Sequence, residues 1–169
     1  MTKRIAIFAL MLMAAVGMQA QSLNGTWKTT MTEDGQKMDF YFIFTQTSLN
    51  MKGVVSMNDP KVGKISVSVN VPCTYTRNSS KLTVKTNPSK AKLNIDKMEF
   101  TSEIAAVISQ SPEMKKLIET QMKQAMESSK SEIVAGFPQS GQLTILTLTS
   151  TKLTLRDETG ETINFTKVR

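Results

Sequence analysis

The side chains that most often carry catalysis or bind metals are scarce in this 169-residue sequence, which contains no histidine and one cysteine. Histidine is the commonest general base and the commonest metal ligand of proteins. No serine lies in a nucleophile-elbow pattern, or in a Ser-x-x-Lys pattern with supporting residues, and no glycine-rich phosphate loop is present. We therefore expect a protein that is not an enzyme and that needs no cofactor.

Two further features could carry chemistry, but each has a simpler interpretation. Cys73 lies on the apolar face of an alternating segment, and a catalytic thiol there would lack a histidine partner. We interpret it as a small buried hydrophobic residue. Asp157, Glu158 and Glu161 cluster at a C-terminal turn and could bind a hard cation, although acids also serve solubility in turns. The sequence thus predicts no metal site.

The remaining candidate functional residues are apolar, and within each predicted strand or helix they lie on one face. Six of them would line a barrel interior, and three helical ones would form its lid: Phe40, Phe42, Phe44, Val67, Val69 and Tyr75, then Met114, Ile118 and Met122. The alternative is a filled core, since a barrel of eight strands encloses either side chains alone or one small ligand. Tyr41 and Ile43 face the other way, and we expect the helical segment to cover them.

Alternation with a period of two predicts that most of the chain forms strands. The clearest case is ISVSVNVPCTYT (65–76), in which Pro72 lies on the polar face and marks an edge or a bulge. The other predicted strands are 25–32, 37–46, 51–57, 81–86, 91–100, 142–149, 152–157 and 161–168. So long a meander must close or double up, because open edges invite aggregation. We predict an all-β fold, an up-and-down antiparallel barrel of about eight to ten strands; a two-sheet sandwich is the alternative.

The spacing of apolar residues changes to a helical period over about 102–136, before the last three strands. Pro112 is suited to the first turn of a helix, and Gly136 with Pro138 ends the pattern. The segment is rich in methionine, which suits adaptable packing. It could pack on the barrel, act as a lid or bind a partner. Contact with a membrane surface ranks last, because glutamates dilute the lysines.

The first 20 residues resemble a secretory signal peptide: Lys3 and Arg4 precede an apolar run that ends near Ala20. No cysteine lies near the cleavage point, so we expect an exported protein, periplasmic or secreted, without a lipid anchor. Residues 21–169 then form one domain. The net charge is +7, but the basic residues are scattered and are not interleaved with aromatic residues. This distribution argues against a nucleic-acid partner.

Gly25-Thr26-Trp27 opens the first predicted strand, and Lys167 and Arg169 close the last one. In a closed meander of even strand number, these two strands are neighbours. Trp27 would then plug one end of the barrel, Gly25 would let the chain bend there, and Lys167 or Arg169 would lie over the indole ring. A Gly-x-Trp on the first strand with a terminal basic residue resembles the lipocalins.

The resemblance is closer to the lipocalin-like domains of exported bacterial proteins, through LNGTW (23–27) and LTLRDETGETINFT (153–166). It implies a calycin-type barrel that binds a small apolar molecule. Two departures are the helical segment inside the meander and the missing cysteine pairs. Two functions therefore stay open: a non-enzymatic carrier of an apolar ligand, or an envelope interaction module with a filled core and a protein partner.

Overall fold

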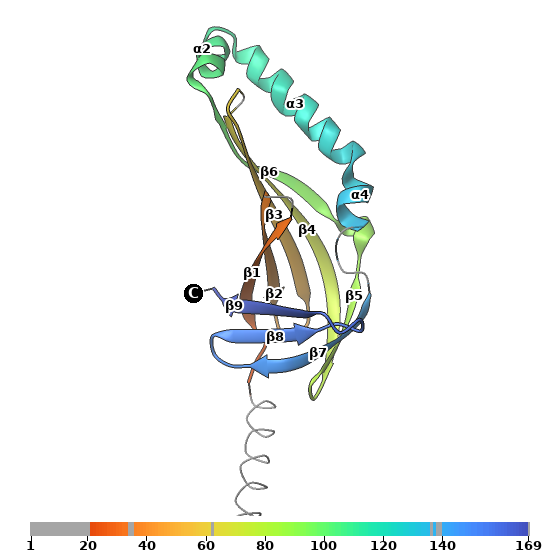
Figure 1. Ribbon diagram of the computed structural model, residues 1–169. Coiled ribbons are helices and arrows are strands. Elements are labelled where there is room, and N and C mark those ends of the chain that lie inside the picture. Colours follow the sequence, from red (N-terminus) through yellow and green to blue (C-terminus); the bar gives the residue numbers. More distant parts are fainter. Residues whose placement is uncertain (1–20, 34–35, 62, 136, 138–139, 169) are drawn as a thin grey trace, which may run out of the picture.

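The computed structural model describes residues 21–33, 36–61, 63–135, 137 and 140–168 (Figure 1). The predicted leader (1–20) and Arg169 lie outside the described residues. The strands are β1 (Gly25–Glu33), β2 (Gln36–Phe44), β3 (Leu49–Asp59), β4 (Gly63–Asn78), β5 (Lys81–Thr86), β6 (Lys92–Phe100), β7 (Gly141–Leu148), β8 (Lys152–Arg156) and β9 (Thr162–Lys167). A short 3₁₀ helix, η1 (Pro88–Lys90), precedes β6, and helices α2 (Ser102–Gln110), α3 (Pro112–Ser128) and α4 (Lys130–Ala135) follow it.

Strands β1 to β5 and β7 to β9 close into an antiparallel barrel of eight strands. The closure joins β9 to β1, where Lys167 pairs with Trp27. The predicted barrel is thus confirmed, and so is the helical segment before the last three strands; the sandwich alternative is excluded. In the part of the chain that the structure describes, no helix is long and apolar enough to cross a membrane.

Strand β6 is the exception to the meander, because it does not join β5 or β7. The long strand β4 pairs with β3 along one edge, from Gly63 to Cys73. Its other edge pairs first with β6, through Gly63 to Asn70, and then with β5, from Cys73 onward. Pro72 lies where the partner changes, a place that tolerates a residue without an N–H. Pro72 thus lies in a local gap in the pairing of a central strand, and the predicted edge or bulge was wrong.

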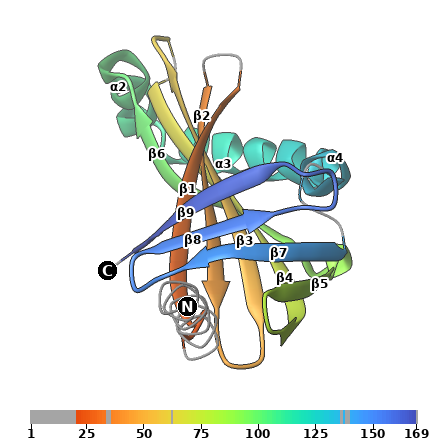
Figure 2. The ribbon, with the colours of Figure 1, turned by 60° about the horizontal axis from the view of Figure 1, so that its bottom comes forward.

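The barrel has two levels because its strands differ in length. β7, β8 and β9 have 8, 5 and 6 residues, whereas β3 and β4 have 11 and 16. β9 pairs with β1 only at Trp27 and Lys28. We call the closed level the lower barrel and the level beyond it the upper sheet, which comprises residues 29–33, 36–40, 53–59, 63–69 and 92–100. Figure 1 shows this sheet extending past β7 to β9, and Figure 2 shows those three strands crossing the long ones.

The lower barrel is filled by side chains. Those less than 2% exposed are Trp27, Leu49, Met51, Val71, Leu82, Leu153 and Leu155. The Phe42 and Phe165 rings lie with their centroids 4.7 Å apart across this interior. Around these residues the lower barrel corresponds to the filled-core interpretation. At the side of the β8–β9 turn, a pocket of about 310 Å³ reaches Phe42, Met51 and Val84.

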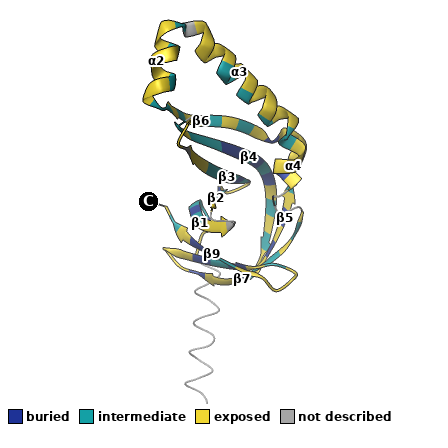
Figure 3. Cartoon of the chain, turned by 45° about the horizontal axis from the view of Figure 1, so that its top comes forward, coloured by how far each residue is buried: buried dark blue, intermediate teal, exposed yellow. Residues whose placement is uncertain are grey.

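The helical segment covers the inner face of the upper sheet. α2 lies at the far end of β6, and α3 runs back along β6 to α4 (Figures 1 and 3). Val134 of α4 is buried in the core, and the Phe137 ring packs edge-on against Phe40, with centroids 5.8 Å apart. The outer surfaces of α2 and α3 are exposed (Figure 3).

The expectation that this segment would cover Tyr41 and Ile43 was wrong. It packs on the face that bears Phe40, and neighbouring residues of a strand point to opposite faces. On the outer face the Lys28 ammonium lies 5.5 Å from the centroid of the Tyr41 ring, and Asp39 pairs with Lys28 at 2.7 Å. Burial disfavours the charged Asp39, but hydrogen bonds from Lys28 and Thr30 outweigh it and lower the pKa of Asp39. Around Tyr41 this polar network takes the place of the expected helical cover.

Candidate functional site

The inner face of the upper sheet carries an open pocket of about 600 Å³, which we call the sheet pocket. Directly paired residues of adjacent strands share a face, and the pairs Met38–Val55 and Phe40–Gly53 bring their side chains to this one. Its principal lining is Met31, Met38, Phe40, Gly53, Val55, Val69, Ile133 and Phe137. Met31 is still 37% exposed, which is high for an apolar residue beside a core.

Gly53 provides the room in which Phe137 packs. A Cβ at position 53 would lie 2.8 Å from Phe137 Cζ, closer than real Cβ contacts. Neither residue was a candidate from the sequence. Phe137 follows the helical pattern, beside Gly136, and so belonged to no predicted apolar face. A glycine inside the strand pattern at 53 is the signal that could have indicated a close approach.

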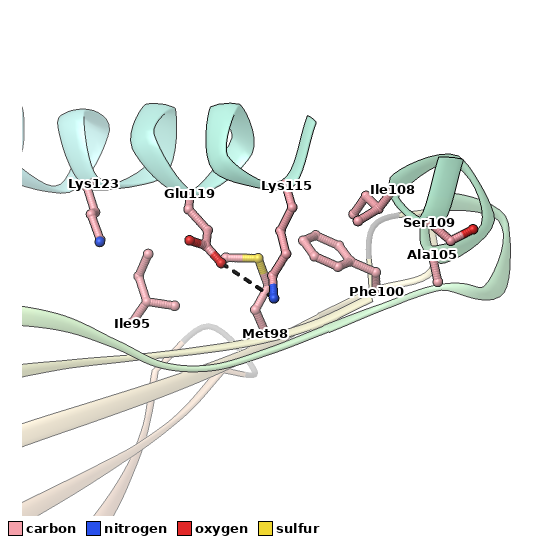
Figure 4. A pocket seen from close by; sticks show the side chains of 9 residues that line it. All are labelled: Ile95, Met98, Phe100, Ala105, Ile108, Ser109, Lys115, Glu119 and Lys123. Carbon is pink, nitrogen blue, oxygen red and sulfur yellow. Dashed lines mark ion pairs between the residues drawn. The ribbon is translucent and has the colours of Figure 1, made fainter. Parts of the chain in front are cut away.

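A second pocket, of about 540 Å³, lies between β6 and the helices, and we call it the helix trough (Figure 4). Its floor is formed by Ile95, Met98 and Phe100 of β6. Ala105, Ile108 and Ser109 of α2 close one end, and Lys115, Glu119 and Lys123 of α3 lie opposite the floor. The trough is therefore apolar below and charged above.

A register shift in β6 aims its apolar residues at the trough. Ile95 pairs with Val67, but the next pair on this face is Met98 with Ile65, so the strand carries one extra residue between them. Such a bulge re-phases the alternation. Asp96, at the bulge, accepts a hydrogen bond from Ser68 at 2.9 Å and pairs with Lys52 at 3.4 Å. The change from Leu93 and Ile95 to Met98 and Phe100 is visible in the sequence.

The sheet pocket and the helix trough lie on the same face of one sheet. Val55 lines the sheet pocket, Ile95 lines the trough, and the half-buried Val67 pairs with both. Val69 of the sheet pocket is likewise paired with Leu93, which faces α3 through a smaller pocket containing Ile95 and Lys123. An apolar path thus runs from Met31 across the sheet to β6.

The predicted barrel-lining residues divide between this path and the filled core. Phe40, Val67 and Val69 lie along the path. Phe42 and Phe44 are buried in the lower barrel, their ring centroids 6.2 Å apart. The Tyr75 ring packs edge-on against Phe44 with centroids 5.2 Å apart, and its hydroxyl donates to the Thr45 carbonyl at 2.7 Å. The structure therefore does not bring all six together around one cavity.

The three predicted lid residues lie on α3 but are not in the lining of the trough. Met114 is 39% exposed, whereas Ile118 and Met122 are half-buried. The residues of α3 that line the trough and the pocket continuing it are Lys115, Glu119, Lys123, Met126 and Glu127. The sequence indicated the apolar stripe of α3, but not that charged residues next to it would share the inner side.

The residues of the Gly-x-Trp motif meet at the end of the lower barrel. Trp27 is fully buried, its indole N–H donates to the Leu23 carbonyl at 2.7 Å, and Lys167 Nζ lies 4.9 Å from its ring centroid. Gly25 has φ +120°, and a Cβ there would lie 2.7 Å from Lys167 Cε. The predicted contact with a cation of the last strand is present through Lys167; Arg169 lies outside the described residues.

The reactive and acidic groups take structural places. Cys73 is buried, and burial raises the pKa of its thiol to about 11, so the nucleophilic thiolate is rare near neutral pH. At the β8–β9 turn, Asp157 accepts bonds from Thr159 Oγ1 at 2.7 Å and from the Glu161 amide at 2.8 Å. Glu158 accepts from the Gln142 amide at 2.9 Å. Among the described residues, no group of three acidic, histidine or cysteine side chains could hold a metal ion.

The chain matches no protein-family model, no curated protein and no solved structure. Within the described residues, the apolar path beneath the helices joins two pockets with room for a ligand.

Proposed function

We propose that this protein is an exported, lipocalin-like carrier that binds a small apolar molecule without transforming it. The observation that carries the proposal is the apolar path on the inner face of the upper sheet, with the sheet pocket of about 600 Å³ and the helix trough of about 540 Å³. Ligand sites in proteins are mostly apolar concavities of roughly 300–1,000 Å³. The absence of histidine from the sequence supports binding over catalysis.

The arrangement of the two levels supports the same function. The filled lower barrel gives a rigid base, and the ligand would lie above it between the sheet and α3. Methionines at positions 31, 38, 98 and 126 line the pockets, and their flexible thioether side chains adapt to ligands of irregular shape. The helical segment would act as a partial cover, not as a plug in the barrel.

A second candidate is an envelope interaction module that binds another protein. It is favoured by apolar side chains on the helices that face solvent, Val107 at 54% and Leu117 at 52% exposed. Exposed apolar residues that gather on one surface mark interaction sites. The filled lower barrel is also compatible with this function.

The test is the uptake of a polarity-sensitive apolar dye by the purified mature chain, together with native mass spectrometry of protein isolated gently from its host. The carrier proposal expects saturable dye fluorescence and an extra mass that leaves on organic extraction. Val55→Trp, which fills the sheet pocket, should weaken dye binding at least tenfold, or about 1.4 kcal/mol. Ser56→Trp, on the next residue and the opposite face, should bind as the wild type does.

A bare mass combined with no dye uptake would reject the carrier. If Val107→Ser and Leu117→Ser then abolished capture of a single host protein at stoichiometric yield, the interaction module would replace it. Equal weakening by Val55→Trp and Ser56→Trp would show that the dye binds elsewhere.

A further inference from the structure

The inner side of α3 carries a ladder of alternating charges along the apolar path. Lys115, Glu119, Lys123 and Glu127 follow one another at spacings of four residues along α3, so they lie on one side of that helix. Lys130, the first residue of α4, continues the series three residues further on. Each lines a pocket between the helices and the strand region below. The ladder begins and ends with lysine.

The ladder contains three lysines and two glutamates, so one positive charge is not neutralised within it. Lys115 pairs with Glu119 at 4.0 Å, and Lys130 pairs with Glu127 at 3.5 Å. Lys123, between the two pairs, makes no ion pair within the described residues. Three lysines against two glutamates leave a single positive charge, whichever lysine is paired at a given moment.

The unpaired cation stands over an apolar floor. Lys123 lines both the helix trough and the smaller pocket that continues it, and both pockets contain Ile95. In Figure 4 its ammonium points from α3 toward the strand, into the space beside Ile95, while Lys115 reaches toward Glu119. The long lysine stem keeps the charge at the polar rim while its methylenes border the apolar surface.

The apolar floor extends in one direction from this charge. Ile95, Met98 and Phe100 lie in sequence along β6, and Ile108 of α2 faces the far end. Ile95 pairs with Val67 and Phe100 with Gly63, four residues away on β4, so at about 3.3 Å per residue the two ends of the floor are roughly 13 Å apart. Among the described residues, Lys123 is the cation without an ion-pair partner at the Ile95 end of this floor, and the Lys115–Glu119 pair, neutral as a whole, lies opposite its middle. This arrangement matches a molecule with one anionic head and one unbranched tail.

From this juxtaposition we infer that the cargo is a single-chain anionic amphiphile, whose acidic head pairs with Lys123 and whose tail lies on Ile95, Met98 and Phe100. This inference rests on the proposed carrier function and names the ligand class. Binding would complete the charge ladder, since the head supplies the missing negative charge. A charge-assisted pair is stronger than a neutral hydrogen bond, so an acid should bind more tightly than an uncharged analogue of equal length.

The experiment compares decanoate with 1-decanol by calorimetric titration of the full mature chain at low salt. Decanoate should bind roughly five- to tenfold more tightly, which corresponds to a charge-assisted hydrogen bond partly screened by solvent. Lys123→Gln should lower decanoate affinity to that of 1-decanol, so that the preference for the acid disappears. Lys116→Gln removes an exposed lysine of the same helix that lines none of these pockets, and should keep the preference. Decyl phosphate, titrated in parallel, tells whether a carboxylate or a phosphate head fits better.

Equal binding of decanoate and 1-decanol by the wild type would overturn the anionic head while leaving the carrier function in place. A preference for decanoate that persists in Lys123→Gln would overturn the assignment to Lys123. Binding of neither molecule, with no uptake of the apolar dye, would overturn the inference and the proposed function together. Lys123→Glu guards against a folding artefact, because it should reverse the preference toward decylammonium.

Discussion

The lower barrel and the upper sheet share the four strands β1 to β4, yet side chains pack the interior of the first and leave open pockets on the second. In the lower barrel β1 to β4 are closed by β5 and β7 to β9, and the side chains converge on one another. In the upper sheet no strand stands opposite, and the helices cover the same face loosely, leaving the sheet pocket and the helix trough. The difference lies in what faces the strands, not in the strands themselves.

Under the proposed carrier function, the lower barrel would supply the stability of the fold and the upper sheet would supply the ligand site. A close-packed interior makes each methylene matter to stability. A half-open surface of methionine and valine tolerates change and can accept a ligand. Substitutions in the lower barrel should therefore act on the free energy of unfolding, and those in the upper sheet on binding.

The largest expected effect is at Trp27, which is fully buried in the lower barrel. Trp27→Ala should lower the free energy of unfolding by roughly 3–5 kcal/mol, as other large-to-small core substitutions do. Met31→Ala, four residues along the same strand but in the upper sheet, should lower it by less than about 1 kcal/mol. Urea unfolding followed by far-ultraviolet circular dichroism measures both. Equal losses would contradict the division into two levels.

Cys73 offers a chemical measure of the same division. Its thiol lies in the lower barrel with a pKa raised from 9.0 to about 11 by burial, so the thiolate fraction at pH 8 should fall by about 100-fold, equivalent to roughly 2.7 kcal/mol. Iodoacetamide should label it quickly only in denaturant. Val55→Cys in a Cys73→Ala background places the thiol in the sheet pocket, where labelling should proceed without denaturant. Rapid labelling of native Cys73 would show that the lower barrel is not closed.

Much of this division could be predicted from the sequence where the signal is local. The alternation of apolar and polar residues predicted most of the strands, and the change to a helical period predicted the helices. The alternation along the last strand predicted that Lys167 would lie next to Trp27. The pairing of β6 could not be predicted from the sequence. β6 could pair with its neighbour in sequence, β5, or with the free edge of β4, and the choice depends on contacts between residues distant in sequence. The face covered by the helices depended on the same choice, which is why the expected cover of Tyr41 was wrong.

The next effect in size concerns the boundary between the levels, where Gly53 admits the Phe137 ring. Gly53→Ala should destabilise the fold by about 1–2 kcal/mol, since an added carbon must displace that ring. Phe137→Leu should remove most of this penalty in the double variant, a coupling that a double-mutant cycle measures. Gly141→Ala is the matched control, because its Cβ would meet only Glu158 Oε1 at 4.0 Å. Additive losses at positions 53 and 137 would contradict the packing role of Gly53.

The smallest effect is the charge that closes the lower barrel at Lys167. Lys167→Met keeps an apolar stem against Trp27 and Gly25 but removes the ammonium 4.9 Å from the ring centroid. The loss should be about 0.5–1 kcal/mol, the range of cation–π pairs at partly exposed sites. Lys152→Met, an exposed lysine of β8 that lies beside no aromatic ring among the described residues, should change stability by less. Because the contact is with the filled level, dye binding in the upper sheet should be unchanged in both variants. A loss of dye binding in Lys167→Met alone would mean that the two levels are coupled through β1.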